Sequence, residues 1–284
     1  MSEEFKQLVS TQWLEEHLRS KEKLKILDAS WYLPSENRNP KKEFLVTHIP
    51  GSHYFDIDLF SDPNHQLPHM VPSVERFCNE ISKLGVKDED HIVFYDGLGM
   101  FSAARAWWLL KLFGFNRVSV LDGGLPKWIS ENRVVTSEIS ASNVGHITPK
   151  FVRQLVCDWK KVKTFLPRRS RQIIDARSSE RFRGLAAEPR PGLRSGHIPG
   201  STNICYKELI NEDHTIKSQA SLLAIFSSKG IDLSLPIITS CGSGVTAAIL
   251  FLALELVGVK DVAIYDGSWA EWGQRDDLDV ETEL

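Results

Sequence analysis

The sequence predicts an α/β protein that is a tandem duplication of one module, each copy a mainly parallel sheet flanked by helices. Short apolar runs alternate with helical patterns along the 284 residues, which is typical of a parallel sheet. The order of these segments repeats in the second half of the chain. One apolar run, at 236–240, ends in a glycine-rich loop that leads into a helical pattern.

The first half begins with an expected amphipathic helix at 5–20 and a strand at 25–29. A polar loop with prolines then leads to the segment His48-Ile49-Pro50-Gly51. The remaining elements expected in this half are a helix at 73–84, a strand at 91–95, a helix at 102–113 and a strand at 117–121.

The second half repeats three segments of the first in the same order. We therefore expect an N-terminal module at 1–138, a linker and lead-in segment at 139–160, and a C-terminal module at 161–284. The matching segments are Ile173-Ile174-Asp175-Ala176 with Ile26-Leu27-Asp28-Ala29, His197-Ile198-Pro199-Gly200 with His48-Ile49-Pro50-Gly51, and Tyr265-Asp266-Gly267-Ser268-Trp269 with Leu121-Asp122-Gly123-Gly124-Leu125.

The loop after the strand at 236–240 begins at Cys241 and leads into an expected buried helix at 247–257. A loop that enters a helix directs unpaired backbone N–H groups and the positive end of the helix dipole toward its own centre. Gly242 and Gly244 let the backbone curl closely around the sulfur. Since such a cradle favours the thiolate, Cys241 is predicted to be a reactive nucleophile.

The two modules differ at this loop, because the alignment places Asp96 opposite Cys241. The N-terminal module is therefore predicted to be catalytically silent there. His48 and His197 stand at the same place in both modules, including the silent one. We interpret both histidines as structural hydrogen-bonding residues.

Composition excludes several classes of function. A net charge of −3 with 42% hydrophobic and 25% charged residues describes a soluble globular protein without bulk attraction to nucleic acid or anionic membranes. No apolar run approaches about 18 residues, and the first residues carry no targeting pattern, so a cytoplasmic protein is expected. The four cysteines lack the spacing of a zinc site, and neither a metal nor an organic cofactor is expected.

With these motifs the chain resembles the two-domain rhodanese-type sulfurtransferases over nearly its whole length. The resemblance implies a five-stranded sheet in each module and an enzyme that transfers sulfur through a persulfide on Cys241. Relatives that prefer thiosulfate carry two basic residues directly after the cysteine, whereas Gly242 and Ser243 stand here. The resemblance therefore points to the branch that takes sulfur from 3-mercaptopyruvate and releases pyruvate.

The resemblance also implies how the donor is held. Arg181, in an R-F-R-G segment, and Arg190, in an E-P-R segment, are expected to bind the carboxylate and ketone of the donor. Backbone N–H groups of the loop are expected to bind the thiolate and the persulfide. These loop residues are Gly242, Gly244, Val245 and Thr246.

A proton relay through Ser243, Asp58 and His69 is implied by the same resemblance. From the residues alone, Ser243 equally fits a helix cap, Asp58 a loop acceptor and His69 a packed histidine. The implied acceptors are thioredoxin, other thiols or cyanide, in a monomer or weak dimer without a nucleic-acid or membrane partner. The turn at Gly267 and Ser268 is a further candidate for the pocket wall.

Three other functions remain open. A cysteine phosphatase shares the strand, anion cradle and helix, but needs an arginine about five residues after the cysteine, where Thr246 and Ala247 stand. A thiosulfate:cyanide sulfurtransferase is the nearer alternative. The third is a non-catalytic sulfur carrier or interaction protein.

Overall fold

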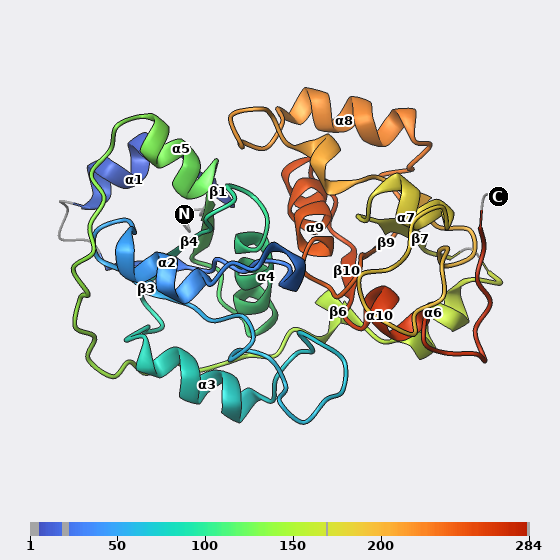
Figure 1. The fold of residues 1–284 in the computed structure, drawn as a ribbon, viewed down its shortest axis with the longest axis horizontal. Helices are drawn as coiled ribbons and strands as arrows, with labels where there is room; N and C mark the ends of the chain where they lie inside the picture. Colours follow the sequence, from blue (N-terminus) through green and yellow to red (C-terminus); the bar gives the residue numbers. More distant parts are fainter. Residues whose placement is uncertain (1–5, 19–22, 169, 283–284) are drawn as a thin grey trace. The chain divides into compact units, whose positions relative to one another are not determined.

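The computed structural model describes residues 6–18, 23–168 and 170–282. They form two compact units, drawn mainly in blue to green and in yellow to red in Figure 1. Each unit includes one short segment from the other half of the sequence. The N-terminal unit comprises Met1–Pro63, Val71–Val152 and Asn211–Ile216, and the C-terminal unit comprises Asn64–Met70, Arg153–Ile210 and Lys217–Leu284.

The N-terminal unit is built on a five-stranded parallel sheet. Its strands are β1 (Leu8–Val9), β2 (Leu24–Asp28), β3 (Ser52–Tyr54), β4 (His91–Tyr95) and β5 (Val118–Leu121). They lie in the order β1-β5-β4-β2-β3. The helices are α1 (Thr11–Leu18), α2 (Pro40–Val46), α3 (Val74–Lys83), α4 (Ala103–Leu112) and α5 (Gly124–Ser130), with a 3₁₀ turn η1 (Pro34–Glu36).

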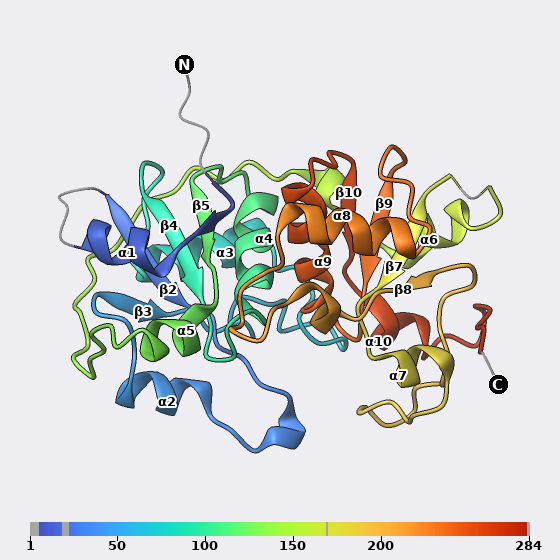
Figure 2. The ribbon, with the colours of Figure 1, turned by 90° about the horizontal axis from the view of Figure 1, so that it is seen from above.

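The C-terminal unit repeats this sheet. Its strands are β6 (Val156–Cys157), β7 (Gln172–Asp175), β8 (Thr202–Asn203), β9 (Ile237–Ser240) and β10 (Val262–Tyr265), in the order β6-β10-β9-β7-β8. Figure 2 shows the strands of each sheet as arrows with helices beside them. The helices are α6 (Trp159–Phe165), α7 (Ser179–Arg183), α8 (Gln219–Ser228), α9 (Ala247–Leu256) and α10 (Ser268–Trp272), with 3₁₀ turns η2 (Arg153–Leu155) and η3 (Tyr206–Leu209).

The strand registers confirm the duplication. The last pair of β2 with β4 is Asp28 with Tyr95, and the last pair of β7 with β9 is Asp175 with Ser240. The loops that follow therefore begin at equivalent points, with Asp96 in one unit and Cys241 in the other. The predicted fold class, with five parallel strands in each copy, is confirmed.

The helix expected at 5–20 is partly wrong. Leu8 and Val9 form the edge strand β1 beside β5, and helix α1 begins only at Thr11. Ser10 separates the two elements, because its hydroxyl accepts a hydrogen bond from the Trp13 N–H at 3.1 Å and caps the helix. Residues 5, 19 and 20 of the expected helix lie outside the described residues.

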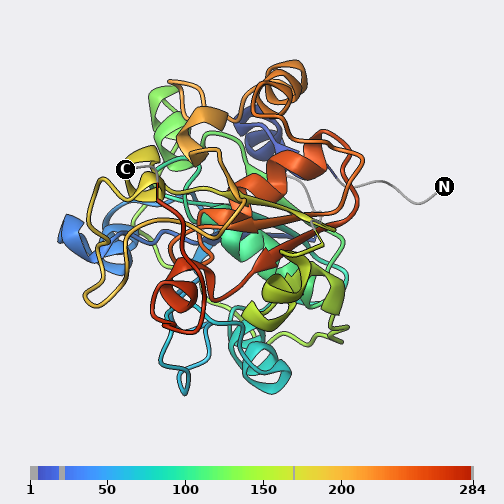
Figure 3. The same ribbon diagram turned by 90° about the vertical axis from the view of Figure 1, so that its right-hand side faces the viewer.

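Helices cover both faces of the C-terminal sheet. Helix α9, buried over nearly its whole length, packs on β9 and β10, as the pattern at 247–257 predicts. On the other face, α6 and α10 contribute Val162, Trp269 and Trp272 to a core cluster with Ile173 and Ile238. Figure 3 shows these helices above and below the strands.

The two repeated histidines have the structural function that the sequence predicts. Nδ1 of His48 lies 2.6 Å from the Phe44 carbonyl oxygen, and Nδ1 of His197 lies 2.8 Å from that of Phe182. Each imidazole also stacks on the same phenylalanine, with ring centroids 4.2 and 3.8 Å apart respectively. Each histidine therefore connects the segment before the third strand of its unit to a helix of the same unit, α2 or α7.

Within residues 6–18, 23–168 and 170–282, no helix has both the length and the apolar character needed to cross a bilayer.

Candidate functional site

The loop that carries Cys241 joins the end of β9 to the start of α9, as predicted. Cys241 is buried, with 2% of its surface exposed, and Val245 is buried beside it in the loop. Gly244 has a φ of 79°, in the left-handed region that favours glycine. Thr246 stands directly before α9 as the N-cap residue.

The equivalent loop of the N-terminal unit shows what this backbone arrangement binds. One carboxylate oxygen of Asp96 accepts three backbone hydrogen bonds and the other accepts a fourth. The donors are the N–H groups of Phe101, Ser102 and Ala103, at 2.8, 2.9 and 2.8 Å, and of Leu98, at 2.9 Å. The loop is thus an anion site, and here it is filled by the side chain of its own first residue.

The cysteine loop of the C-terminal unit has a similar backbone arrangement. Both loops follow equivalent strands, contain a glycine with positive φ (Gly99 at 98° and Gly244 at 79°) and enter a buried helix. The first loop is longer by one residue. Where Asp96 brings a carboxylate, Cys241 brings a sulfur, and the predicted thiolate there remains a prediction.

A second segment fixes the main chain of the cysteine loop. The Cys241 N–H donates to Ser268 Oγ at 3.2 Å, and the Ser268 hydroxyl donates to the Tyr265 carbonyl at 2.8 Å. The carbonyls of Cys241 and Gly242 accept from the N–H groups of Trp269 and Ala270, at 2.9 and 2.8 Å. Ser268, which the sequence predicts only as a possible wall, therefore supports the backbone of the nucleophile.

Two guanidinium groups lie close to Gly242, the residue after Cys241. A β-carbon placed on Gly242 would lie 3.1 Å from Nη2 of Arg181 and 3.9 Å from Nη1 of Arg190. The structure therefore brings both predicted arginines to the cysteine loop, although they come from a different segment of the unit. It also shows why glycine suits position 242, because a side chain there would point at both cations.

Glu188 is a residue that the sequence did not single out, although it belongs to the same E-P-R segment as Arg190. Its side chain is 1% exposed and accepts hydrogen bonds from Arg181 through both carboxylate oxygens, at 3.2 and 2.5 Å. It also accepts one from Arg177 at 2.8 Å. The available signal was its position two residues before a predicted substrate arginine.

The structure also brings two of the three predicted relay residues together. Nδ1 of His69 lies 3.0 Å from Oγ of Ser243, and both side chains are buried. His69 belongs to the segment Asn64–Met70, which is part of the C-terminal unit. Asp58 belongs to the N-terminal unit, where its carboxylate accepts a hydrogen bond from the Trp31 indole at 3.3 Å. Its part in a relay remains a prediction.

The other three cysteines lie in less favourable settings for a thiolate. Burial raises the pKa of Cys157 to about 12. Burial also raises the pKa of Cys78 and of Cys205 above the ordinary value. These directions disfavour a thiolate at the three other cysteines, and the reactivity of Cys241 remains a prediction.

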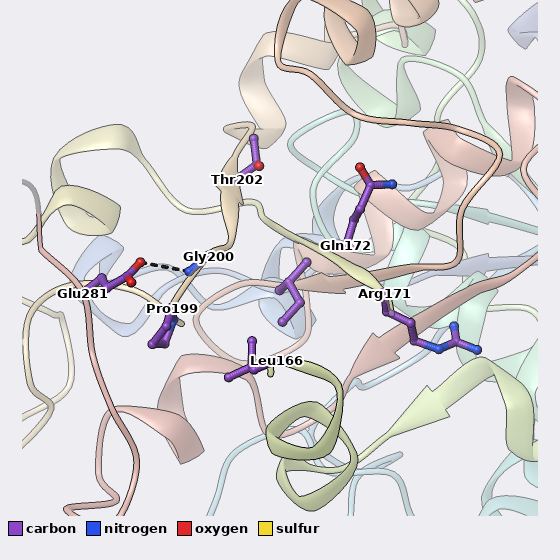
Figure 4. Close-up of a pocket in the computed structure, with 8 residues that line it drawn as sticks. Leu166, Arg171, Gln172, Pro199, Gly200, Thr202 and Glu281 are labelled. Atoms are coloured by element: carbon purple, nitrogen blue, oxygen red, sulfur yellow. Dashed lines mark hydrogen bonds between the residues drawn. The ribbon is translucent and has the colours of Figure 1, made fainter. Parts of the chain in front are cut away.

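A cavity of ≈ 380 Å³ lies elsewhere in the C-terminal unit (Figure 4). Arg171, Gln172 and Thr202 line it together with Glu281, which accepts a hydrogen bond from the Gly200 N–H at 2.9 Å. Gln172 is the first residue of β7, whereas the cysteine loop follows the last residue of β9. The cavity is therefore at the opposite ends of the strands and contains none of the predicted site residues.

Known proteins resemble this chain over both halves. The model of the rhodanese-like domain matches residues 10–131 and 158–275. Thiosulfate/3-mercaptopyruvate sulfurtransferase 1, mitochondrial, of Arabidopsis thaliana is 44% identical, covering 97% of this chain and 78% of the relative. The 3-mercaptopyruvate sulfurtransferase of Escherichia coli K12 is 43% identical, covering 96% and 97% respectively.

A solved structure agrees with these relatives. The crystal structure of SseA from Escherichia coli, described as a 3-mercaptopyruvate sulfotransferase, matches with a TM-score of 0.85 at 39% identity. The match covers 93% of this chain and 99% of that one.

Proposed function

Since the chain belongs to the rhodanese family, we propose that its C-terminal unit moves the sulfur of 3-mercaptopyruvate through a Cys241 persulfide to a thiol or to cyanide. The names of the relatives agree with the activity that the sequence predicts. Residue assignments within the site are part of the proposal.

One observation carries the choice of donor. Arg181 and Arg190 both reach the residue that follows Cys241, while the loop itself has Gly242 and Ser243 where a basic pair would serve an inorganic dianion. Two guanidinium groups match the adjacent carboxylate and ketone oxygens of a 2-keto acid. A donor held there presents its sulfur to Cys241.

The first half-reaction follows from this placement. The Cys241 thiolate attacks the sulfur of 3-mercaptopyruvate, the carbon–sulfur bond breaks, and the bonding electrons pass to the carbon as the enolate of pyruvate. Arg181 and Arg190 stabilise the charge on the enolate oxygen. Protonation of the enolate carbon gives pyruvate, and the transferred sulfur remains on Cys241 as a persulfide.

Ser243 and His69 supply a route for that proton. Their hydrogen bond at 3.0 Å couples a hydroxyl in the cysteine loop to an imidazole, and positioned acid–base groups of this kind accelerate proton transfer. Asp58 is the third candidate for the proton relay, because the family resemblance implies it.

In the second half-reaction an acceptor thiolate or cyanide attacks the outer sulfur and regenerates the Cys241 thiolate. Thioredoxin is the proposed physiological class of acceptor, and the cytoplasm the proposed location. The two stages require ping-pong kinetics.

Incubation with 3-mercaptopyruvate in the absence of acceptor tests the proposal. One equivalent of pyruvate should form, and the intact protein should gain about 32 mass units, one sulfur atom, on Cys241. A Cys241→Ser variant should do neither. Pyruvate release without the mass gain would exclude the persulfide, and the absence of both would exclude the activity.

Thiosulfate is the second candidate donor, because the Arabidopsis thaliana relative carries both donors in its name. We expect the kcat/KM for 3-mercaptopyruvate to exceed that for thiosulfate. The reverse order would make thiosulfate:cyanide transfer the principal activity.

A further inference from the structure

Four charged side chains of the C-terminal unit form a continuous row that ends at the cysteine loop. In order they are Asp175, Arg177, Glu188 and Arg181. Arg181 is the end that reaches Gly242, and its side chain is 22% exposed. The other three are almost completely enclosed, with 1% or 2% of each side chain exposed.

Glu188 is not needed merely to neutralise Arg177. The Asp175 carboxylate already accepts hydrogen bonds from Arg177. The Arg177 Nε lies 3.1 and 3.0 Å from its two oxygens, and the Arg177 Nη2 lies 2.7 Å from one of them. The Gly196 carbonyl accepts a further hydrogen bond from Nη2 at 2.8 Å. Arg177 is thus paired without Glu188, whereas Arg181 donates two charge-assisted hydrogen bonds to Glu188.

The N-terminal unit lacks this row at the equivalent place. Ser30 stands where the C-terminal unit has Arg177, and Asp28 accepts hydrogen bonds from the Ser30 N–H and hydroxyl instead. The buried pair of Asp175 with Arg177 therefore occurs only in the copy that contains the cysteine.

From this arrangement we infer that Glu188 is a specificity-determining residue, whose negative charge beside Arg181 makes the site favour a donor with one charge over a donor with two. The inference rests on the proposed function. 3-Mercaptopyruvate brings one carboxylate, whereas thiosulfate brings two negative charges. At equal distance the carboxylate of Glu188 repels thiosulfate about twice as strongly as it repels 3-mercaptopyruvate.

Glu188→Gln removes this charge and keeps the size of the side chain. The ratio of kcat/KM for thiosulfate to kcat/KM for 3-mercaptopyruvate should rise about tenfold at low ionic strength. Added salt should reduce the rise, because it screens the extra charge. Glu208→Gln is the matched control, since Glu208 pairs with Lys229 at 3.1 Å in the same unit. Its ratio should equal that of the unchanged protein.

An equal loss with both donors would show that Glu188 only orders Arg181, and would overturn the inference. Glu188→Asp separates charge from shape, because it keeps the charge and withdraws the carboxylate by one methylene. It should lower both rates and leave the ratio unchanged. A raised ratio of kcat/KM for thiosulfate to that for 3-mercaptopyruvate in Glu188→Asp would also contradict the inference. If Glu188→Gln fails to fold, the ratio in Glu188→Asp is the deciding measurement.

A readout independent of turnover separates this inference from the proposed function. Sulfate, a dianion, and pyruvate, a monoanion, should each protect Cys241 from alkylation by iodoacetamide. In Glu188→Gln the protection by sulfate should strengthen about tenfold relative to pyruvate. Unchanged relative protection would refute the inference even if 3-mercaptopyruvate is a donor. Failure of the unchanged protein to release pyruvate would instead refute the proposed function.

Discussion

A single residue, Ser268, adopts a costly backbone conformation beside Cys241. Its φ is 50°, and the equivalent residue of the N-terminal unit, Gly124, has a φ of 52°. A non-glycine residue in this region costs about 1 to 2 kcal/mol. The C-terminal copy has serine at this position where the other copy has glycine, and the serine hydroxyl accepts a hydrogen bond from the Cys241 N–H.

Two substitutions of Ser268 separate strain from hydrogen bonding. Ser268→Ala loses the hydroxyl and keeps the strain, whereas Ser268→Gly loses both. We expect the free energy of unfolding, measured with urea, to be about 1 kcal/mol higher in Ser268→Gly than in Ser268→Ala. Both should lower the rate of persulfide formation about tenfold, since the loop loses a support. Full activity in Ser268→Gly would contradict the supporting function.

Asp28 allows a prediction of pH dependence at the same scale. Burial, the largest cause, raises its pKa from 3.8 to about 6, although hydrogen bonds from Ser30 oppose the shift. A carboxyl with a raised pKa holds its proton more tightly in the folded protein, so the free energy of unfolding falls as the pH rises from about 4 to about 6.

Asp28→Asn should remove this dependence. The amide oxygen can still accept from the Ser30 N–H and hydroxyl, and it carries no charge to bury. At pH 7 the variant should be more stable by at most about 3 kcal/mol, and the difference should vanish near pH 4. Urea unfolding at several pH values measures it. A stability difference that does not change with pH would disprove the assignment.

At the scale of elements, the strand-to-helix loop of the N-terminal unit is an anion site filled by Asp96. In the N-terminal unit the four backbone donors converge on Asp96. The sequence predicts a similar set of donors around Cys241 in the other copy, and Asp96 offers a way to test what such a loop contributes.

Asp96→Asn tests the loop as an element. Removing the charge should lower the free energy of unfolding by about 2 kcal/mol, because hydrogen bonds to a charged acceptor are replaced by weaker ones. Asp232→Asn is the control, since Asp232 is an exposed acceptor for the Ser234 N–H; its effect should stay within about 0.5 kcal/mol. Comparable losses in the two variants would argue against a special anion site.

The sequence predicts the strongly apolar elements and misses a helix that lies in a polar stretch. The patterns at 91–95 and 247–257 are long and apolar enough to show their period. Helix α2 has only seven residues, and it is held by the Asn39 side chain at its N-terminus and by Pro40 at its first position. Within a polar, proline-containing stretch, such a helix has no periodicity to detect.

At the scale of the whole chain, the duplication is what allows a candidate site to be predicted from sequence. Comparison of two copies separates residues of the fold, such as His48 and His197, from Cys241, which only one copy has. Glu188 was not found in this way, and Ser268 was predicted only as a possible wall of the pocket. Their significance comes from contacts with residues such as Arg181 and Cys241, and those contacts depend on how the segments fold together.

The segments exchanged between the halves of the chain supply a matched pair of histidines. His69, in Asn64–Met70, and His214, in Asn211–Ile216, have φ values of 59° and 67°. His69 contacts Ser243 in the C-terminal unit, whereas His214 packs near Gly99 in the N-terminal unit. Of the two segments, Asn64–Met70 therefore brings its imidazole to the loop that contains Cys241.

Asparagine tolerates such φ values, so His69→Asn and His214→Asn change the side chain with little backbone strain. His69→Asn should lower kcat for pyruvate release about 100-fold, because a proton-transfer group is lost. His214→Asn should leave kcat unchanged. Equal effects in the two variants would mean that the segments only stabilise their units. A large loss confined to His69→Asn would instead identify the imidazole beside Ser243 as the acid–base group of the site.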